Sequence, residues 1–109
     1  MMQLVRFYLT QTRRHHGVLL YEWLLEQARD RGASGATAFH ALAGFGRHHW
    51  HEATFFELAG EVPVAVEVIA PEAVVADLVA AIDAEGLSIP YLQVPVELRV
   101  TGEARQSGQ

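Results

Sequence analysis

This 109-residue chain contains no cysteine and no lysine. Without cysteine, the protein has no disulfide, no thiol nucleophile and no sulfur ligand for a metal. Without lysine, it cannot form a Schiff base or hold a phosphate with an ammonium group, because every basic residue other than histidine is arginine. The lack of cysteine agrees with a reducing compartment, and we expect a cytoplasmic protein.

Charge is also scarce, and its sign does not suit a nucleic-acid partner. Charged residues make up 19% of the chain and the net charge is −5, whereas a general nucleic-acid binder needs a basic face. We therefore expect no nucleic-acid partner. No run of about 18 apolar residues is present, so we expect no direct membrane insertion. Residues 1–6 lack the basic stretch of a secretory signal.

The hydrophobic pattern predicts four strands and two helices. Residues 3–10 and 63–70 alternate with the period of a strand, and Leu20, Leu24 and Ala28 have the spacing of one helix face. The predicted strands are 3–10, 36–43, 63–70 and 91–100, and the predicted helices are 18–31 and 71–84. We expect one domain, residues 1–100, followed by a polar tail, residues 101–109.

This order of elements is β-α-β-β-α-β, which predicts an α+β, ferredoxin-like fold. In that fold two helices cover one face of a four-stranded antiparallel sheet. The other face is then expected to expose a mixed apolar and charged set: Leu4, Arg6, Tyr8, Ala65, Glu67, Ile69, Glu97 and Arg99. Such a patch on a single chain marks an association site. Since half of the residues are hydrophobic, we expect an oligomer in which the opposite charges pair.

The connection between the second and third predicted strands, residues 44–62, is longer than this fold requires. Connections above about 12–15 residues are usually functional or disordered. This one contains the aromatic residues Phe45, Trp50, Phe55 and Phe56. Two interpretations remain open: the loop extends the hairpin and packs on a neighbouring subunit, or its tip changes order when a ligand binds.

Four short motifs resemble a known family. They are Gly35-Ala36-Thr37, Gly44-Phe45-Gly46, Trp50-His51 and the run from Val62 to Val68. In order and spacing they are similar to the Gly-Ala-Thr, Gly-Phe-Gly, Ile-His and Leu-Pro-Val-Val-Ile-Glu-Ile pattern of domain of unknown function 190, a relative of the PII (GlnB-like) superfamily. The resemblance extends over residues 2 to 100, which is nearly the whole chain.

The resemblance implies a PII-like regulatory subunit, usually a homotrimer, whose residues 44–62 correspond to the partner-binding T-loop. PII proteins bind adenine nucleotides between subunits. They hold the phosphates with a turn rich in glycine and lysine, whereas the matching segment here, residues 85–91, has one glycine and no lysine. Relatives are sometimes encoded beside fluoride-exporter-type membrane proteins, which implies a membrane-transporter partner. The sequence itself identifies no cofactor.

The candidate ligand-binding residues are glycines and arginines in the expected loops. Gly44, Phe45, Gly46 and Arg47 offer backbone N–H groups and a guanidinium, a combination that can cradle an anion. The Gly-x-Gly also suits a plain bend from strand to loop. Arg13 and Arg14 either add positive charge to a cleft between subunits or belong to a solvated turn. Arg99 is placed to reach an anion at the subunit boundary.

An alternative function is metal binding by a trimer similar to CutA. Four residues of the long loop offer imidazole or carboxylate ligands for zinc, copper or nickel: His48, His49, His51 and Glu52. Their spacing is not a specific zinc signature, and a solvated loop is the simpler explanation. No nucleophile–base–acid arrangement can be read from the sequence, so we expect a regulatory protein rather than an enzyme.

Overall fold

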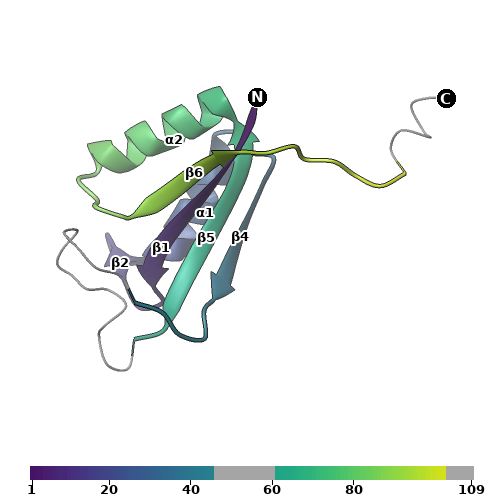
Figure 1. The fold of residues 1–109 in the computed structure, drawn as a ribbon. Helices are drawn as coiled ribbons and strands as arrows, with labels where there is room; N and C mark the ends of the chain where they lie inside the picture. Colours follow the sequence, from purple (N-terminus) through teal and green to yellow (C-terminus); the bar gives the residue numbers. More distant parts are fainter. Residues whose placement is uncertain (46–60, 103–109) are drawn as a thin grey trace.

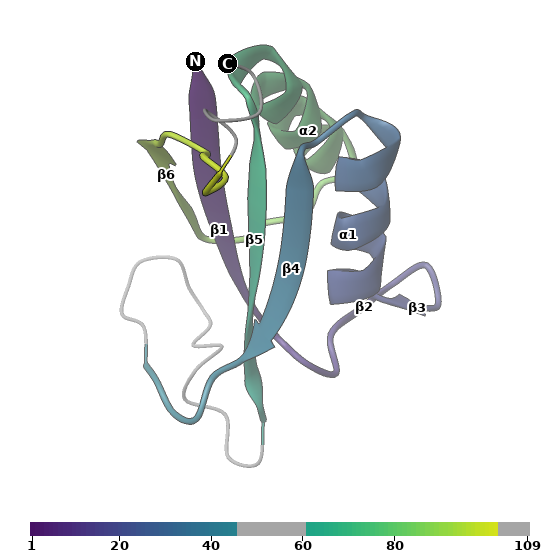
Figure 2. The ribbon, with the colours of Figure 1, turned by 90° about the vertical axis from the view of Figure 1, so that its right-hand side faces the viewer.

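A computed structural model describes residues 1–45 and 61–102 of the chain. Its main sheet has four antiparallel strands in the order β4-β5-β1-β6. The strands of this sheet are β1 (Met2–Thr10), β4 (Gly35–His40), β5 (Pro63–Pro71) and β6 (Tyr91–Pro95). Helices α1 (Leu20–Asp30) and α2 (Glu72–Ala84) cover one face of the sheet (Figures 1 and 2). The predicted ferredoxin-like α+β fold is confirmed.

The core lies between this sheet and the two helices. Alternate residues of the two central strands, β1 and β5, point to the helices, and the helices bury one stripe each. The side chains without solvent exposure include Val5, Leu9, Val66, Val68, Leu20, Leu24, Ala28 and Leu78. Burial of one large aliphatic side chain contributes about 1.5–3 kcal/mol. The period-two and helical patterns in the sequence therefore identified the core correctly.

A small hairpin precedes α1, where the sequence predicted the start of the helix at residue 18. Strands β2 (Arg14–His15) and β3 (Val18–Leu19) pair antiparallel, and the helix begins only at Leu20. The two residues between the strands, His16 and Gly17, have φ of 52° and 82°. Positive φ at both central positions defines the tight type I′ hairpin turn. The prediction of helix at residues 18 and 19 was therefore wrong.

Strand β6 is shorter than predicted because its partner strand, β1, begins at Met2 and offers no further backbone to pair with. The alternating pattern continues to Val100, but the strand ends at Pro95. In the register, Pro95 lies opposite Gln3 of β1, which itself begins at Met2. One further bond, from the Val96 N–H to the Met2 carbonyl at 3.1 Å, ends the pairing. The chain then crosses the end of the sheet (Figure 1), so Glu97 and Arg99 do not continue it as strand residues.

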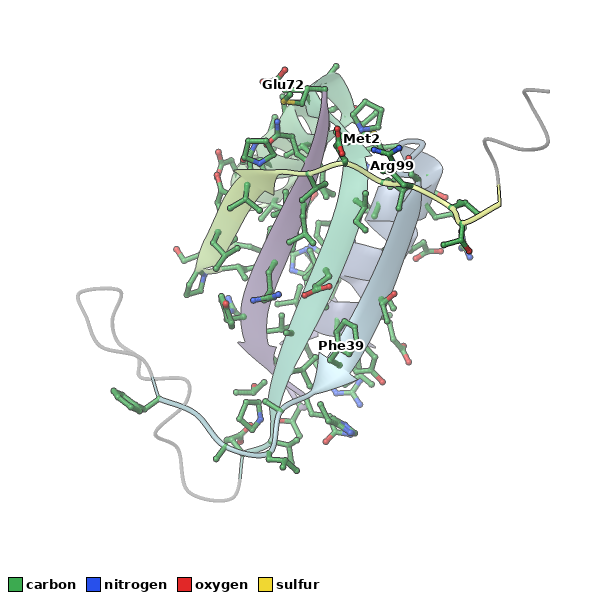
Figure 3. The ribbon with its side chains drawn as sticks, turned by 45° about the vertical axis from the view of Figure 1, so that its right-hand side comes forward. Met2, Phe39, Glu72 and Arg99 are labelled. Carbon is green, nitrogen blue, oxygen red and sulfur yellow. The ribbon has the colours of Figure 1, made fainter. Side chains whose placement is uncertain are left out.

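The face of the sheet away from the helices, here called the open face, is apolar around one ion pair. Arg6 and Glu67 lie opposite each other on β1 and β5, with Arg6 Nε donating to Glu67 Oε2 at 2.8 Å. The apolar residues on this face are Leu4, Tyr8, Phe39, Ala65, Ile69, Leu92 and Val94. Phe39 projects from this face and is 48% exposed (Figure 3). The predicted mixture of apolar and charged residues is present on the strands, whereas Glu97 and Arg99, which were expected on this face, lie beyond the end of β6.

Neither α1 nor α2, the helices of the described ranges, is long and apolar enough to cross a membrane. Of the predicted polar tail, residues 103–109 lie outside the described residues.

Candidate functional site

Three connections meet at one end of the sheet, here called the loop end. The register pairs Thr10 with Pro63 and places His40 opposite Val64, so β1 and β4 finish where β5 starts. Backbone hydrogen bonds join the connections there: the Gln11 N–H donates to the Val62 carbonyl at 2.9 Å. The Tyr8 N–H donates to the Pro90 carbonyl at 3.0 Å. The loop end therefore brings together segment 11–17, segment 85–90 and both ends of the 44–62 connection.

Arg13 is half-buried at the loop end, directly after β1. Its backbone is fixed, because its N–H donates to the Thr10 carbonyl at 3.3 Å and its carbonyl accepts from the Leu20 N–H at 2.8 Å. Burial lowers the pKa of its guanidinium, which nevertheless stays charged. Within residues 1–45 and 61–102, no carboxylate pairs with this side chain. A half-buried cation of this kind suits an anionic ligand.

Arg14, the neighbouring candidate, has a structural role that the sequence did not indicate. Its Nη1 donates to the Gly17 carbonyl at 2.9 Å and so closes the β2–β3 hairpin. The side chain is otherwise exposed. Because a guanidinium has five N–H donors, this bond leaves donors that can face a ligand.

The long connection contributes two described candidates, Gly44 and Phe45. Both are exposed, and Phe45 retains 65% of its accessible surface. Gly46 and Arg47 lie outside the described residues, as do His48, His49, His51 and Glu52 of the metal alternative. The anion cradle and the loop metal site therefore stay predictions.

Arg99 lies far from the other candidates within one chain. It lines a 400 Å³ surface pocket together with Met1 and Met2, beside the start of β1 (Figure 3). Arg13 follows the other end of that strand, whose length is about 27 Å at about 3.4 Å per residue. Arg99 Nη1 lies 3.4 Å from Glu97 Oε1, and both side chains are exposed. A shared site of Arg13 and Arg99 therefore needs a second chain.

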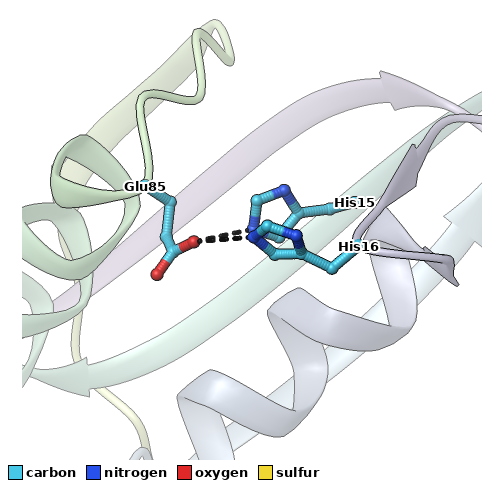
Figure 4. Close-up of side chains that lie close together, drawn as sticks. All are labelled: His15, His16 and Glu85. Atoms are coloured by element: carbon cyan, nitrogen blue, oxygen red, sulfur yellow. Dashed lines mark hydrogen bonds and ion pairs between the residues drawn. The ribbon is translucent and has the colours of Figure 1, made fainter.

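One polar cluster at the loop end escaped the sequence analysis. His15 and His16 of the hairpin converge on Glu85, which follows α2 (Figure 4). The hydrogen bond from His15 is the main cause that lowers the pKa of Glu85. Two adjacent histidines before a glycine were the available signal in the sequence. The carboxylate is 70 residues further along the chain, however, and periodicity gives no information about such a distance.

A four-stranded antiparallel sheet with two helices on one face and a long connection at the loop end is a PII-like fold. A candidate PII-like signaling protein from Thermus thermophilus is similar over 85% of this chain and 84% of its own, with a TM-score of 0.57 and 19% identity. CPII from Thiomonas intermedia K12, solved with ADP, AMP and acetate, is similar over 84% of this chain and 82% of its own. For CPII the TM-score is 0.60 and the identity 17%. At these identities the similarity shows the fold.

The sequence comparison is more specific. The model of the family DUF190, described as "Uncharacterized ACR", matches residues 2–87. A UPF0166 protein of Aquifex aeolicus (strain VF5) is 37% identical over 71 residues, which are 64% of this chain and 68% of the relative. The chain belongs to the DUF190 family, as the four motifs indicated.

Proposed function

We propose that this chain is a subunit of a PII-like signalling protein that binds a small anionic ligand, an adenine nucleotide in particular, at the loop end of the sheet. The fold supports the proposal, and so does the presence of ADP and AMP on the similarly folded CPII. In this proposal the protein is cytoplasmic and regulatory rather than catalytic.

The observation that carries the proposal is the half-buried Arg13 guanidinium. A cation partly removed from water is costly unless an anion compensates it, and the described residues supply no carboxylate to Arg13. The chain has no lysine, so arginine must provide the charge that holds a phosphate. Exposed donors of Arg14 and the backbone at Gly44 to Gly46 complete the proposed anion site.

The proposed oligomer is a homotrimer in which sister chains cover the open face. Its apolar residues include Phe39, Leu92 and Val94, which are 48%, 38% and 42% exposed in the single chain. Burial of such a face drives association. Association also offers the route by which Arg99 of one chain can approach Arg13 of another, since one chain keeps them at opposite ends of β1.

The 44–62 connection is the proposed output of the ligand site. A ligand shifts a conformational equilibrium only as far as it binds the two states with different affinity. Both ends of this connection are at the loop end, where the Ala41 N–H donates to the Pro63 carbonyl at 2.9 Å. A bound anion beside Arg13 therefore lies where it can change the state of the connection. A partner protein, such as a membrane transporter, is proposed to bind the connection in one of its two states.

Isothermal titration calorimetry with ADP and AMP tests this function. We expect saturable binding to the wild type and at least a tenfold loss of affinity in Arg13→Gln, since a hydrogen bond to a charged group contributes about 1.5–3 kcal/mol. Arg29→Gln is the matched control, because Arg29 is an exposed arginine in the last turn of α1. Equal affinity in the two variants, or no heat with either nucleotide, would contradict the proposal.

The alternative of a CutA-like metal-binding trimer remains a separate hypothesis. It rests on His48, His49, His51 and Glu52, all outside the described residues. Alanine at the three histidines is expected to abolish stoichiometric metal uptake if that alternative is correct.

A further inference from the structure

Three side chains with metal-binding atoms converge at the loop end, two from the β2–β3 hairpin and one from the residue after α2. His15 Nε2 lies 2.9 Å from Glu85 Oε1, and His16 Nε2 lies 3.4 Å from the same oxygen (Figure 4). One ligand atom from each of the three residues lies within 4.8 Å of the others. Around a tetrahedral zinc ion with bonds of about 2.0–2.1 Å, neighbouring ligand atoms are about 3.3 Å apart. The two separations from Glu85 Oε1, 2.9 and 3.4 Å, are close to that value.

The hairpin turn explains why two consecutive histidines share one side. Consecutive residues of a strand point to opposite faces, but the chain reverses at His16, whose φ is 52°. The two imidazole rings consequently lie with centroids 4.1 Å apart. Glycine at position 17, with φ of 82°, completes the turn. The hairpin thus places two consecutive imidazoles on one side, as a helix does with histidines four residues apart.

Packing fixes the ring of His15, and backbone hydrogen bonds at the end of α2 fix the main chain of Glu85. The side chain of His15 is only 9% exposed and meets the Trp23 ring edge-on at a centroid distance of 5.0 Å. Glu85 is positioned by the end of α2, where the Gly86 N–H donates to the Asp83 carbonyl at 2.9 Å. Preorganised ligands lose little entropy on binding, which favours a specific site over a chance contact.

We propose that His15, His16 and Glu85 form a binding site for a divalent transition-metal ion of the zinc class. Two neutral imidazoles and one carboxylate are a ligand set that suits zinc, cobalt or nickel. His16 and Glu85 are 76% and 41% exposed, so the fourth coordination position faces solvent and takes water or an anion. The metal ties the β2–β3 hairpin to the end of α2. The proposed metal site includes neither Arg13 nor any residue of the open face.

The competing explanation is an ion pair, in which protonated histidines donate to the Glu85 carboxylate. Both explanations use the same three side chains, but they differ in what they bind. An ion pair takes up no metal, whereas the proposed site needs the Nε2 lone pairs and holds one ion per chain. Direct measurement of metal uptake therefore separates them.

The test is calorimetry of the tag-free, chelator-treated full chain with Zn²⁺ alone, and visible absorption with Co²⁺. The background variant carries His48→Ala, His49→Ala and His51→Ala, which removes the loop histidines as competing ligands. We expect one Zn²⁺ per chain in this background and the strong visible absorption of four-coordinate Co²⁺. Added Glu85→Gln or His16→Ala should lower Zn²⁺ affinity at least about tenfold, since even outer-shell changes cost about 10–100-fold.

His40→Ala in the same background is the matched control, because His40 is an exposed histidine at the end of β4. It should bind Zn²⁺ as the background does. His16 is the variant of choice, since its ring is exposed whereas the ring of His15 packs on Trp23. No uptake by the background variant, or equal affinity with and without Glu85→Gln, would overturn the proposal.

Discussion

Arg13 and Glu85 carry opposite charges at the same end of the sheet, but their surroundings differ. The Arg13 guanidinium is half-buried and its pKa is lowered by loss of water. The Glu85 carboxylate is exposed, and its pKa is lowered by hydrogen bonds from His15 and then His16. Burial thus leaves Arg13 in need of an anion, whereas Glu85 already has partners. This difference assigns the nucleotide to Arg13 and the metal ion to the Glu85 cluster in our proposals.

Glu85 also gives a pH-dependent prediction for the metal-free chain. A carboxyl group whose folded pKa is lowered adds stability above its unfolded pKa of about 4.3, and this is lost as pH falls through the folded value. In the presence of chelator, the wild type should therefore melt at a higher temperature than Glu85→Gln above about pH 4.3, and the gap should close in more acidic solution.

Thermal unfolding followed by circular dichroism over a pH series checks this expectation. Glu26→Gln is the control, because Glu26 is an exposed residue in the middle of α1. A gap that is the same at every pH, or that Glu26→Gln reproduces, would show that the Glu85 interaction with the histidines does not stabilise the fold.

Among the secondary-structure elements, long periodic segments were predictable and short ones were not. Strands β1 and β5 and both helices have nine or more residues each, enough for a period to emerge. The β2–β3 hairpin has two residues per strand, which is too few for a pattern. The end of β6 depends on where β1 begins, because pairing needs a partner backbone. The alternating pattern of residues 91–100 does not show where pairing with β1 stops.

The hairpin turn itself can be tested with one substitution. Gly17 has φ of 82° and open space where a Cβ atom would lie, so Gly17→Ala meets no clash but strains the backbone. A left-handed conformation costs an alanine about 1–2 kcal/mol. We expect the free energy of unfolding to fall by about that amount. Gly35→Ala is the matched control, since Gly35 also has open space but no positive φ.

Urea unfolding of the two glycine variants provides the measurement. An effect of Gly17→Ala no larger than that of Gly35→Ala would mean that the turn does not require glycine. It would also mean that the turn places His15 and His16 on the same side of the hairpin without help from Gly17.

At the scale of the whole molecule, only some of the residues that meet at the loop end could be predicted from the sequence. Arg13 was predictable as a charged turn residue, and the structure adds that it is half-buried. The separation of Arg13 from Arg99 required the strand register, and the cluster around Glu85 required a contact across 70 residues of chain. Such relations are set by tertiary packing. Local sequence pattern and composition do not predict such contacts between distant segments.

The open face is the feature of the whole molecule on which the proposed assembly depends. Its centre is the Arg6–Glu67 pair, and the pKa of Arg6 is raised by hydrogen bonds to Tyr8 and Glu67. Leu4 lies opposite both Ile69 and Val94, so an apolar patch borders the pair. In a single chain water would reach this surface. In a trimer sister chains would bury the apolar side chains around an already neutralised pair.

Light scattering of the purified wild type at micromolar concentration shows whether the open face drives the chains to assemble. We expect a particle of about three times the 12.0 kDa mass of one chain. Val94→Asp, which places a charge on the open face, should shift the mass toward the single chain, whereas Val18→Asp on the exposed hairpin should not. A wild type that stays monodisperse at the mass of one chain would rule out the proposed trimer.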